Sequence, residues 1–149
     1  MKIYIIGIGL IGGSMGLDIK ALYPEATIYG IDTNKKHVEE AIALNVINFE
    51  GAITDLATAD FVIVSVPVDT ALRVLPEVLD NIGEHTIVFE VGSTKNPICE
   101  AVANHSKRRN FIATHPIAGT EFSGPSAAIT NLFEGKTNII CEVERTAFK

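Results

Sequence analysis

Residues 3–14 read IYIIGIGLIGGS, an apolar run followed by closely spaced glycines. The run Ile3–Ile6 favours a buried β-strand, and apolar residues recur at helical spacing after the glycines. Gly7, Gly9 and Gly12 lie between the two in the pattern GxGxxG. A strand, a glycine-rich turn and a helix in this order form the start of a βαβ unit. This stretch therefore predicts a parallel α/β sheet.

The alternation of strands and helices continues along the chain. The expected strands are Ile3–Ile6, Thr27–Ile31, Phe61–Val66, Thr86–Val91, Phe111–Thr114 and Thr137–Val143. Most of these runs are continuously apolar, which is typical of strands covered on both faces by helices. Helical patterns fill the intervals between them. We therefore expect right-handed βαβ units in an open, doubly wound, mostly parallel α/β sheet with helices on both faces.

Two prolines mark expected helix boundaries. Asn96 precedes Pro97, so the asparagine is expected to cap a helix whose first position the proline occupies. Pro76 is expected to divide the segment 71–81 into two short helices, because proline lacks the N–H group that a helix interior needs.

The composition predicts one domain without nucleic-acid or membrane partners. The chain has 149 residues, 47% hydrophobic and 20% charged, enough for one sizeable core. A net charge of -6 offers no basic surface to nucleic acid, and the basic run 107–109 is expected to be a solvated turn. No stretch approaches the roughly 20 apolar residues of a membrane helix, so we expect a soluble, cytoplasmic protein. Cys99 and Cys141 match no metal-ligand spacing and are expected to be free thiols.

Each glycine of the motif has a separate expected role. Gly7 would make the tight turn, Gly9 would let backbone approach a pyrophosphate, and Gly12 would let helix and strand pack closely. The N–H groups that open the helix at Leu10 and Ile11 favour a bound phosphate, as does the helix dipole. The alternative is a turn that only packs a helix. The position of the motif directly after a strand favours dinucleotide binding.

Asp32 ends the second expected strand, about 20 residues after the third glycine. An acidic side chain at this interval binds the adenosine ribose hydroxyls. A carboxylate about 4 Å from a 2′-phosphate would oppose it by a few kcal/mol, so we expect NAD as the cofactor rather than NADP. Lys35 and Lys36 would soften this preference, but they are expected to face solvent.

The segment SVPVDT at residues 65–70 lies at the carboxyl end of a strand, where open α/β sheets bind ligands. The backbone of Val66, Pro67 and Val68 is expected to lie along the ribose and pyrophosphate. Asp69 and Thr70 are expected mainly to cap the helix that follows.

Two later strand ends carry groups suited to proton transfer. Gly92 and Ser93 follow one strand, where both are expected to contact the cofactor, and His115 ends the next. In a doubly wound sheet the nicotinamide half of the cofactor lies over the later strands. A neutral imidazole accepts a proton at physiological pH, as the oxidation of an alcohol requires. Ser93 would fix the carboxamide or the substrate hydroxyl.

Four segments resemble the dinucleotide-binding domain of prephenate dehydrogenases, a family that includes arogenate users. They are GIGLIGGS at 7–14 with Asp32, SVPVD at 65–69, VGSTK at 91–95 and HPIAGTEFSG at 115–124. The resemblance extends from residue 1 to about residue 141. It implies a Rossmann-like fold that binds NAD. It also implies oxidative decarboxylation of prephenate to 4-hydroxyphenylpyruvate in tyrosine biosynthesis, a reaction driven by aromatisation of the ring.

The resemblance also implies roles for individual residues. His115 would accept the proton of the substrate hydroxyl, and Ser93 would hydrogen-bond near that hydroxyl and the nicotinamide. Gly119, Thr120 and Glu121 would belong to a loop that shapes and gates the substrate pocket.

Each of these assignments has an alternative. His115 before a proline would serve equally to cap a turn, and Ser93 and Lys95 would organise the loop that enters the next helix. Glu121 would be a solvated carboxylate, the commoner fate of an exposed glutamate. The remaining histidines, at 37, 85 and 105, are expected to be surface residues.

Members of the family carry a second, mostly helical domain that dimerises, completes the pocket and supplies a further histidine and an arginine. Residues 1–143 would thus form the NAD-binding domain, and residues 144–149 would begin the linker to that second domain. We expect the chain to bind NAD but to turn prephenate over poorly, and the full-length protein to be a homodimer.

Two other functions fit the sequence. One is another dehydrogenase of the β-hydroxyacid type or an arogenate dehydrogenase, with the same nucleotide half and a different substrate. The other is a non-catalytic NAD-sensing module. The choice between prephenate and arogenate stays open at this stage.

Overall fold

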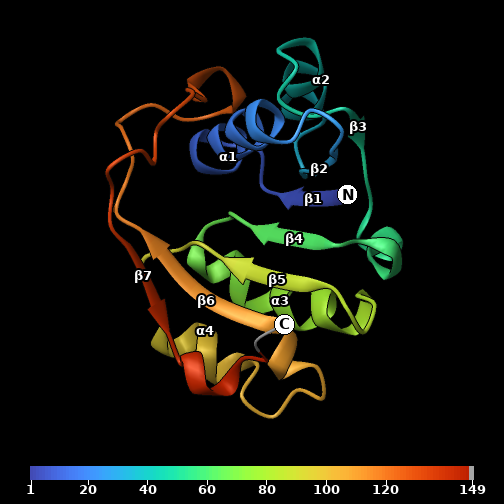
Figure 1. Cartoon of the computed structure of the whole chain (residues 1–149), viewed down its shortest axis with the longest axis vertical. Coiled ribbons are helices and arrows are strands. Elements are labelled where there is room, and N and C mark those ends of the chain that lie inside the picture. The colour runs from blue at the N-terminus through green and yellow to red at the C-terminus, as the bar shows by residue number, and fades with distance from the viewer. Residues whose placement is uncertain (148–149) are drawn as a thin grey trace.

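A computed structural model describes residues 1–147 and shows one seven-stranded sheet in the order β3-β2-β1-β4-β5-β6-β7 (Figure 1). The strands are β1 (Lys2–Ile6), β2 (Thr27–Ile31), β3 (Phe49–Glu50), β4 (Phe61–Val64), β5 (Ile87–Glu90), β6 (Phe111–Pro116) and β7 (Asn138–Cys141). The α-helices are α1 (Leu10–Leu22), α2 (Lys35–Ala43), α3 (Val68–Asn81) and α4 (Asn96–Ala101). Short 3₁₀ segments are η1 (Ile53–Thr58), η2 (Arg108–Asn110), η3 (Pro125–Ala127) and η4 (Val143–Arg145).

The strand order confirms the predicted doubly wound α/β fold. Strands β1 to β6 are parallel to their neighbours, and β7 pairs antiparallel with β6. The order reverses between β1 and β4, which are neighbours although β2 and β3 separate them in sequence. Open α/β sheets bind ligands outside the carboxyl ends of the strands at this kind of reversal. The short edge strand β3, both of whose residues are exposed, was not predicted.

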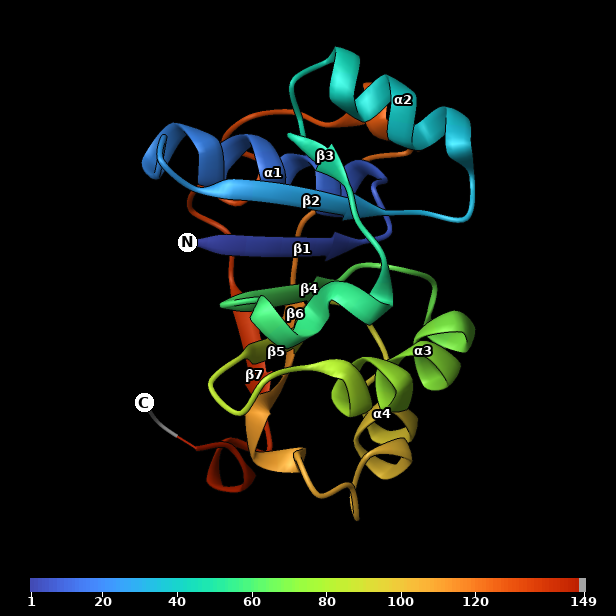
Figure 2. The same ribbon diagram turned by 90° about the vertical axis from the view of Figure 1, so that its right-hand side faces the viewer.

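Two apolar cores lie on opposite faces of the sheet. Tyr4 and Ile6 of β1 belong to the core formed with α3 and α4, whereas Ile3 and Ile5 belong to the core formed with α1 and α2. This alternation follows from the two-residue period of a strand. Figure 2 shows α3 and α4 beside β4 and β5, with α1 and α2 at the β1–β3 end of the sheet. Both faces of the central strands are therefore buried, as their continuous apolar runs predicted.

Two predicted helix boundaries are wrong. Pro76 lies inside one helix, α3, and does not divide it, because the buried face that includes Leu75 and Leu79 holds the helix together on both sides of the proline. Asn96 is the first residue of α4 and not its cap. Its amide instead donates a hydrogen bond to Glu100 Oε1 at 2.9 Å, one helical turn later.

The basic run 107–109 is not a fully solvated turn. Arg108 is 5% exposed and donates hydrogen bonds to the carbonyl oxygen of Phe111 at 2.9 Å and to Glu142 Oε2 at 2.7 Å. The Arg108 guanidinium lowers the pKa of Glu142, chiefly through this hydrogen bond. A buried arginine with these partners ties Glu142, directly after β7, to the start of β6, so its charge has a structural role.

The last described residues fold back onto the domain. The Thr146 hydroxyl donates to the carbonyl oxygen of Phe111 at 2.9 Å, and the amide of Ala147 donates to the carbonyl oxygen of Arg109 at 2.9 Å. Residues 148 and 149, the end of the predicted linker, lie outside the described residues. Both cysteines are free thiols, and no helix within residues 1–147 is long and apolar enough to cross a membrane.

Candidate functional site: a nucleotide cleft and a histidine strand end

The glycine motif forms the turn between β1 and α1, and its three glycines differ as predicted. Gly7 has a φ of +87°, and a Cβ added there would lie 2.6 Å from the carbonyl oxygen of Ser65. A Cβ on Gly12 would lie 2.3 Å from both the carbonyl oxygen of Gly7 and Ser65 Oγ. A Cβ on Gly9 would meet no atom within 4 Å. The first and third glycines are thus required by packing, whereas Gly9 leaves its backbone open to a ligand.

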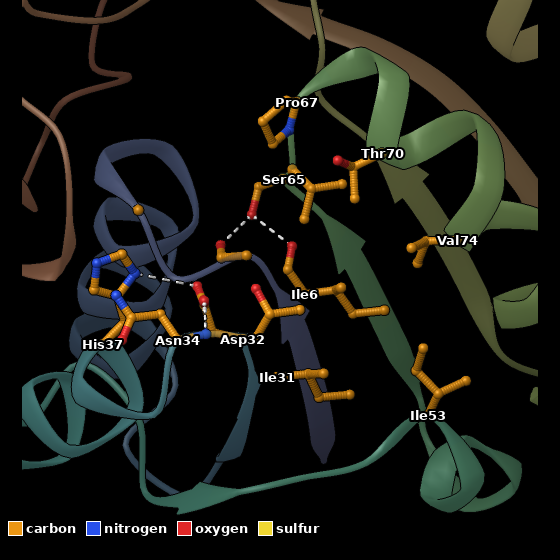
Figure 3. Close-up of a pocket in the computed structure, with 14 residues that line it drawn as sticks. Ile6, Ile31, Asp32, Asn34, His37, Ile53, Ser65, Pro67, Thr70 and Val74 are labelled. Carbon is orange, nitrogen blue, oxygen red and sulfur yellow. Dashed lines mark hydrogen bonds and ion pairs between the residues drawn. The ribbon is translucent and has the colours of Figure 1, made fainter.

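Ser65 joins β4 to this turn and was missing from the predicted site. Its hydroxyl lies 2.7 Å from the carbonyl oxygen of Gly7 and 3.1 Å from that of Ile6, and it donates to them (Figure 3). The sequence feature that could have pointed to Ser65 is its position, as a small hydroxyl residue directly after the apolar run of β4. Its partners could not be read from the sequence, because only the adjacency of β1 and β4 brings them together.

The N-terminus of α1 faces the same region without a side-chain cap. Its N-cap residue is Gly9, which offers no side chain to satisfy the first N–H groups. Leu10 and Ile11 line a hollow together with Gly9. Uncapped amides at a helix N-terminus attract an anionic group, and the helix dipole adds to that attraction.

Asp32 lies at the end of β2, and both of its carboxylate oxygens are engaged. Oδ2 accepts a hydrogen bond from the amide of Ile8 at 3.1 Å, and Oδ1 accepts one from the amide of Asn34 at 2.8 Å. The side chain is 14% exposed. It therefore stands in a fixed orientation beside the glycine turn, as its spacing predicted.

His37 is partly exposed, as expected of a surface residue, but it also lines the cleft, which the sequence did not indicate. It belongs to the first turn of α2, and its Nδ1 lies 3.5 Å from Asp32 Oδ2 (Figure 3). Asn34 caps the same helix by accepting a hydrogen bond from the amide of Lys36 at 3.1 Å. The cap fixes the start of the helix, and the imidazole consequently faces the carboxylate.

These residues line one cleft of about 500 Å³ at the point where the strand order reverses. The cleft is lined by Ile6, Gly7, Gly9, Ile31, Asp32, Thr33, Asn34, His37, Ile53, Ser65, Val66, Pro67, Thr70 and Val74. Its volume lies in the range of small-molecule sites. Its wall is apolar along Ile53 and Val74 and polar at Asp32, an arrangement that suits a flat ring attached to a sugar (Figure 3).

The start of α3 differs from the prediction. Pro67 occupies the N-cap position, and no side chain caps the helix, so Asp69 and Thr70 do not have the expected capping role. Thr70 instead lines the cleft, while Asp69 is exposed in the first turn. Val66 and Pro67 line the cleft, whereas Val68 packs against the core.

A second hollow continues from the glycine turn toward β5. Gly9, Pro67 and Gly92 line it, and residues 122–124 of the long β6–β7 connection form its other side. The predicted cofactor residues at the ends of β1, β4 and β5 therefore share a continuous edge of the sheet. An elongated ligand that begins in the Asp32 cleft would extend along this edge.

The structure places the predicted proton-transfer residues farther along the same edge without joining them. Ser93 is exposed in the loop after β5, and His115 is partly buried near the end of β6. His115 lines a shallow hollow with Ile117, Ala118, Gly119, Leu132 and Lys136, and Ser93 is not among its lining residues. His115 therefore lines a hollow at the surface that does not include Ser93.

The predicted substrate loop is open. Gly119, Thr120 and Glu121 are all exposed. Thr120 Oγ1 accepts a hydrogen bond from the amide of Phe122 at 3.2 Å, and Glu121 lines a separate hollow with Phe122 and Ser123. The loop is anchored only locally at this point.

A buried ion pair lies beneath these residues. Glu90 is 0% exposed, and its carboxylate binds the Lys95 ammonium and the amide of Gly92. The Lys95 ammonium also donates to the carbonyl oxygen of Thr114 at 2.6 Å, and the Thr114 hydroxyl donates to the carbonyl oxygen of Glu90 at 2.9 Å. These contacts tie the Ser93 loop to the strand that carries His115. The sequence showed an acidic and a basic residue flanking that loop but not their burial.

No group of His, Cys, Asp and Glu side chains within residues 1–147 has the arrangement of a metal site.

Comparison with known proteins identifies the relatives of this fold and site. Residues 15–149 match the family model described as prephenate dehydrogenase, nucleotide-binding domain. A prephenate dehydrogenase of Bacillus subtilis is 35% identical over 148 residues, which make up 97% of this chain and 40% of that protein. The chain thus spans well under half the length of this relative.

Solved structures agree. The Aquifex aeolicus prephenate dehydrogenase in complex with hydroxyphenyl propionate and NAD⁺ is 30% identical, with a TM-score of 0.89 over 99% of this chain and 52% of that one. The Synechocystis arogenate dehydrogenase is 28% identical, with a TM-score of 0.88 over the same shares of the two chains. The chain therefore belongs to the prephenate dehydrogenase family and corresponds to its nucleotide-binding domain.

Proposed function

We propose that this chain is the NAD-binding part of a dehydrogenase that oxidises and decarboxylates prephenate or the closely related arogenate. The observation that carries the proposal is the cleft in which Gly9 leaves its backbone open and Asp32 holds a carboxylate beside the glycine turn. The relatives with this nucleotide-binding domain include both prephenate and arogenate dehydrogenases.

The residues of the cleft fit the adenosine and pyrophosphate of NAD. The Asp32 carboxylate would accept hydrogen bonds from the ribose hydroxyls, and the uncapped amides of Leu10 and Ile11 would bind the pyrophosphate. The apolar wall at Ile53 and Val74 would cover the adenine. The open backbone at Gly9 is the point where a phosphate can approach most closely.

Oxidation of the substrate requires a proton acceptor and a hydride acceptor. A bound nicotinamide would supply the hydride acceptor. His115 would take the proton of the substrate hydroxyl, because it lines a hollow near the end of β6. As the C–H and O–H bonds break, the hydroxyl carbon becomes a carbonyl. Loss of the ring carboxylate as carbon dioxide would then leave its electron pair to the ring, which becomes aromatic as the carbonyl oxygen takes up a proton.

Ser93 and the exposed loop would position the substrate. Ser93 would hydrogen-bond near the reacting hydroxyl, and Gly119, Thr120 and Glu121 would shape the pocket. Both segments are exposed in this structure, so further contacts would have to order them. We propose that a second, dimerising domain of the full-length protein supplies these contacts, and that this chain by itself binds NAD with little turnover.

The test is a calorimetric titration of NAD into the 149-residue chain and into Gly9→Val. The new side chain meets no protein atom at its Cβ, so it should leave the fold intact and obstruct the pyrophosphate. We expect a loss of about tenfold or more in NAD affinity. Gly119→Val is the matched control, because a Cβ there is equally unobstructed but lies outside the cleft. Equal NAD affinity in all three chains would contradict the proposed site.

A further inference from the structure

His37 brings a second ionisable group into the cleft beside Asp32. The two side chains are the titratable groups among the residues that line this cleft. The imidazole Nδ1 lies 3.5 Å from Asp32 Oδ2, and the imidazole is 36% exposed, so the ring is accessible to both solvent and ligand. Figure 3 shows the ring on the glycine-turn side of the cleft, joined to Asp32 by the dashed contact.

Apart from Asp32, the charged residues near His37 are those of its own helix, α2. On its own helix, Lys35, Lys36 and Glu39 are exposed, and Glu40 is partly buried. The neighbouring segment η3, which contacts α2, contributes only the uncharged Pro125–Ala127. Across the cleft, the lining residues of η1, of α3 and of the connection between β4 and α3 are uncharged as well. The charge state of the imidazole therefore acts chiefly on Asp32 and on any group bound next to it.

We infer that His37 sets, together with Asp32, how strongly this cleft rejects a phosphate on the adenosine 2′-oxygen. The inference rests on the proposed function, because it requires the adenosine ribose to bind at Asp32. With a neutral imidazole, the carboxylate charge is unopposed and repels a 2′-phosphate. A protonated imidazole balances that charge and offers N–H donors to a phosphate. Discrimination against NADP should therefore weaken as the pH falls, and NAD, which has no 2′-phosphate, should be affected less.

The experiment measures the ratio of the NADP and NAD dissociation constants by calorimetry at about pH 8 and about pH 5.5, a range that spans imidazole titration. The 2′-phosphate also titrates near pH 6, so the pH dependence of the unaltered chain alone is not diagnostic. His37→Gln provides the control, because glutamine keeps a polar side chain of similar reach and cannot become charged. His37→Arg carries a permanent charge at the same position.

Between about pH 8 and about pH 5.5, the ratio of the NADP to the NAD dissociation constant should decrease in both chains. We expect this decrease to be about fivefold larger in the unaltered chain than in His37→Gln. His37→Arg should show a ratio at about pH 8 that is about fivefold below that of the unaltered chain. The same pH dependence in the unaltered chain and His37→Gln, with NAD bound normally, would overturn the role of His37 and leave the proposed function intact. Failure of every chain to bind NAD would overturn both.

Discussion

The nucleotide end and the histidine end of this sheet edge are built in different ways. At the nucleotide end, Gly7 and Gly12 allow contacts that any side chain would block, and Ser65 fastens the turn to the next strand. At the histidine end, Ser93 and residues 119–121 are exposed, and the order comes from the buried pair of Glu90 and Lys95 below them.

The difference indicates that the two ends of the sheet edge depend on different kinds of contact. The nucleotide end is formed by close contacts at Gly7 and Gly12 together with the hydrogen bond from Ser65, and it borders a cleft of about 500 Å³. At the histidine end, the Glu90–Lys95 pair is buried, whereas Ser93 and residues 119–121 are exposed. Under the proposed function, this exposed surface would receive the substrate and contacts from a second domain. The predictions below test whether each end depends on the features assigned to it.

The largest expected effect is at the base of the histidine end. Lys95→Met leaves the carboxylate of Glu90 buried without a charge partner, which should lower the free energy of unfolding by about 3–5 kcal/mol. Urea denaturation measures this loss. Lys35→Met, on the exposed surface of α2, is the matched control and should change stability by less than about 0.5 kcal/mol.

A double variant separates the charge from the packing. Adding Glu90→Gln to Lys95→Met removes the uncompensated charge, so much of the lost stability should return. If Lys95→Met costs no more than Lys35→Met, the buried pair does not anchor this end.

The second effect concerns the rate of reaction. In the full-length polypeptide that the proposed function requires, His115→Asn should lower kcat by about 100-fold or more, because it removes the proton acceptor. Its NAD dissociation constant should stay unchanged, because His115 lies outside the nucleotide cleft. An unchanged rate would favour a histidine that only closes a turn. If the full-length protein shows no turnover, and if NAD binding is the same in His115→Asn, a non-catalytic NAD-binding module would be favoured.

The third effect distinguishes packing from ligand access at the nucleotide end. Gly12→Ala places a Cβ 2.3 Å from the carbonyl oxygen of Gly7, so it should destabilise the chain by about 1–3 kcal/mol. Gly9→Ala adds the same methyl group in open space, so it should leave the melting temperature almost unchanged. Thermal denaturation of the two variants without ligand checks this contrast. Equal melting temperatures would mean that the close approach at Gly12 is not a constraint.

The smallest effect is expected at Ser65. Ser65→Ala removes the hydrogen bond to the carbonyl oxygen of Gly7, a loss of about 1 kcal/mol in stability, and loosens the turn that presents Gly9. NAD affinity should fall with it, as calorimetry would show. Ser126→Ala, at an exposed serine of η3, should change neither quantity. A Ser65→Ala chain that binds NAD normally would show that the turn holds its shape without β4.

The elements that sequence could predict are those determined by local rules. The GxGxxG turn, the acidic residue at the end of β2 and the apolar strands follow from spacing and periodicity, and all lie where they were expected. The helix boundaries that failed, at Pro76 and Asn96, are those at which tertiary packing or a side-chain contact one turn away outweighed a local preference.

The missed residues depend on contacts between distant segments. Ser65 meets Gly7 only because β4 crosses over to lie beside β1. His37 faces the cleft because α2 begins at a cap next to Asp32. Arg108 is buried because the chain after β7 brings Glu142 back to it. None of these pairings leaves a periodic trace in the sequence, so each had to be seen in three dimensions.

The central claim is that this chain holds NAD across the glycine turn with its adenosine ribose at Asp32. A crystal structure of the 149-residue chain grown with NAD tests it most directly. We predict ribose hydroxyls at hydrogen-bond distance, about 2.5–3.2 Å, from the Asp32 carboxylate, with the pyrophosphate against the amides of residues 9–11. NAD bound elsewhere on the chain, or absent from this cleft at saturating concentration, would contradict the claim.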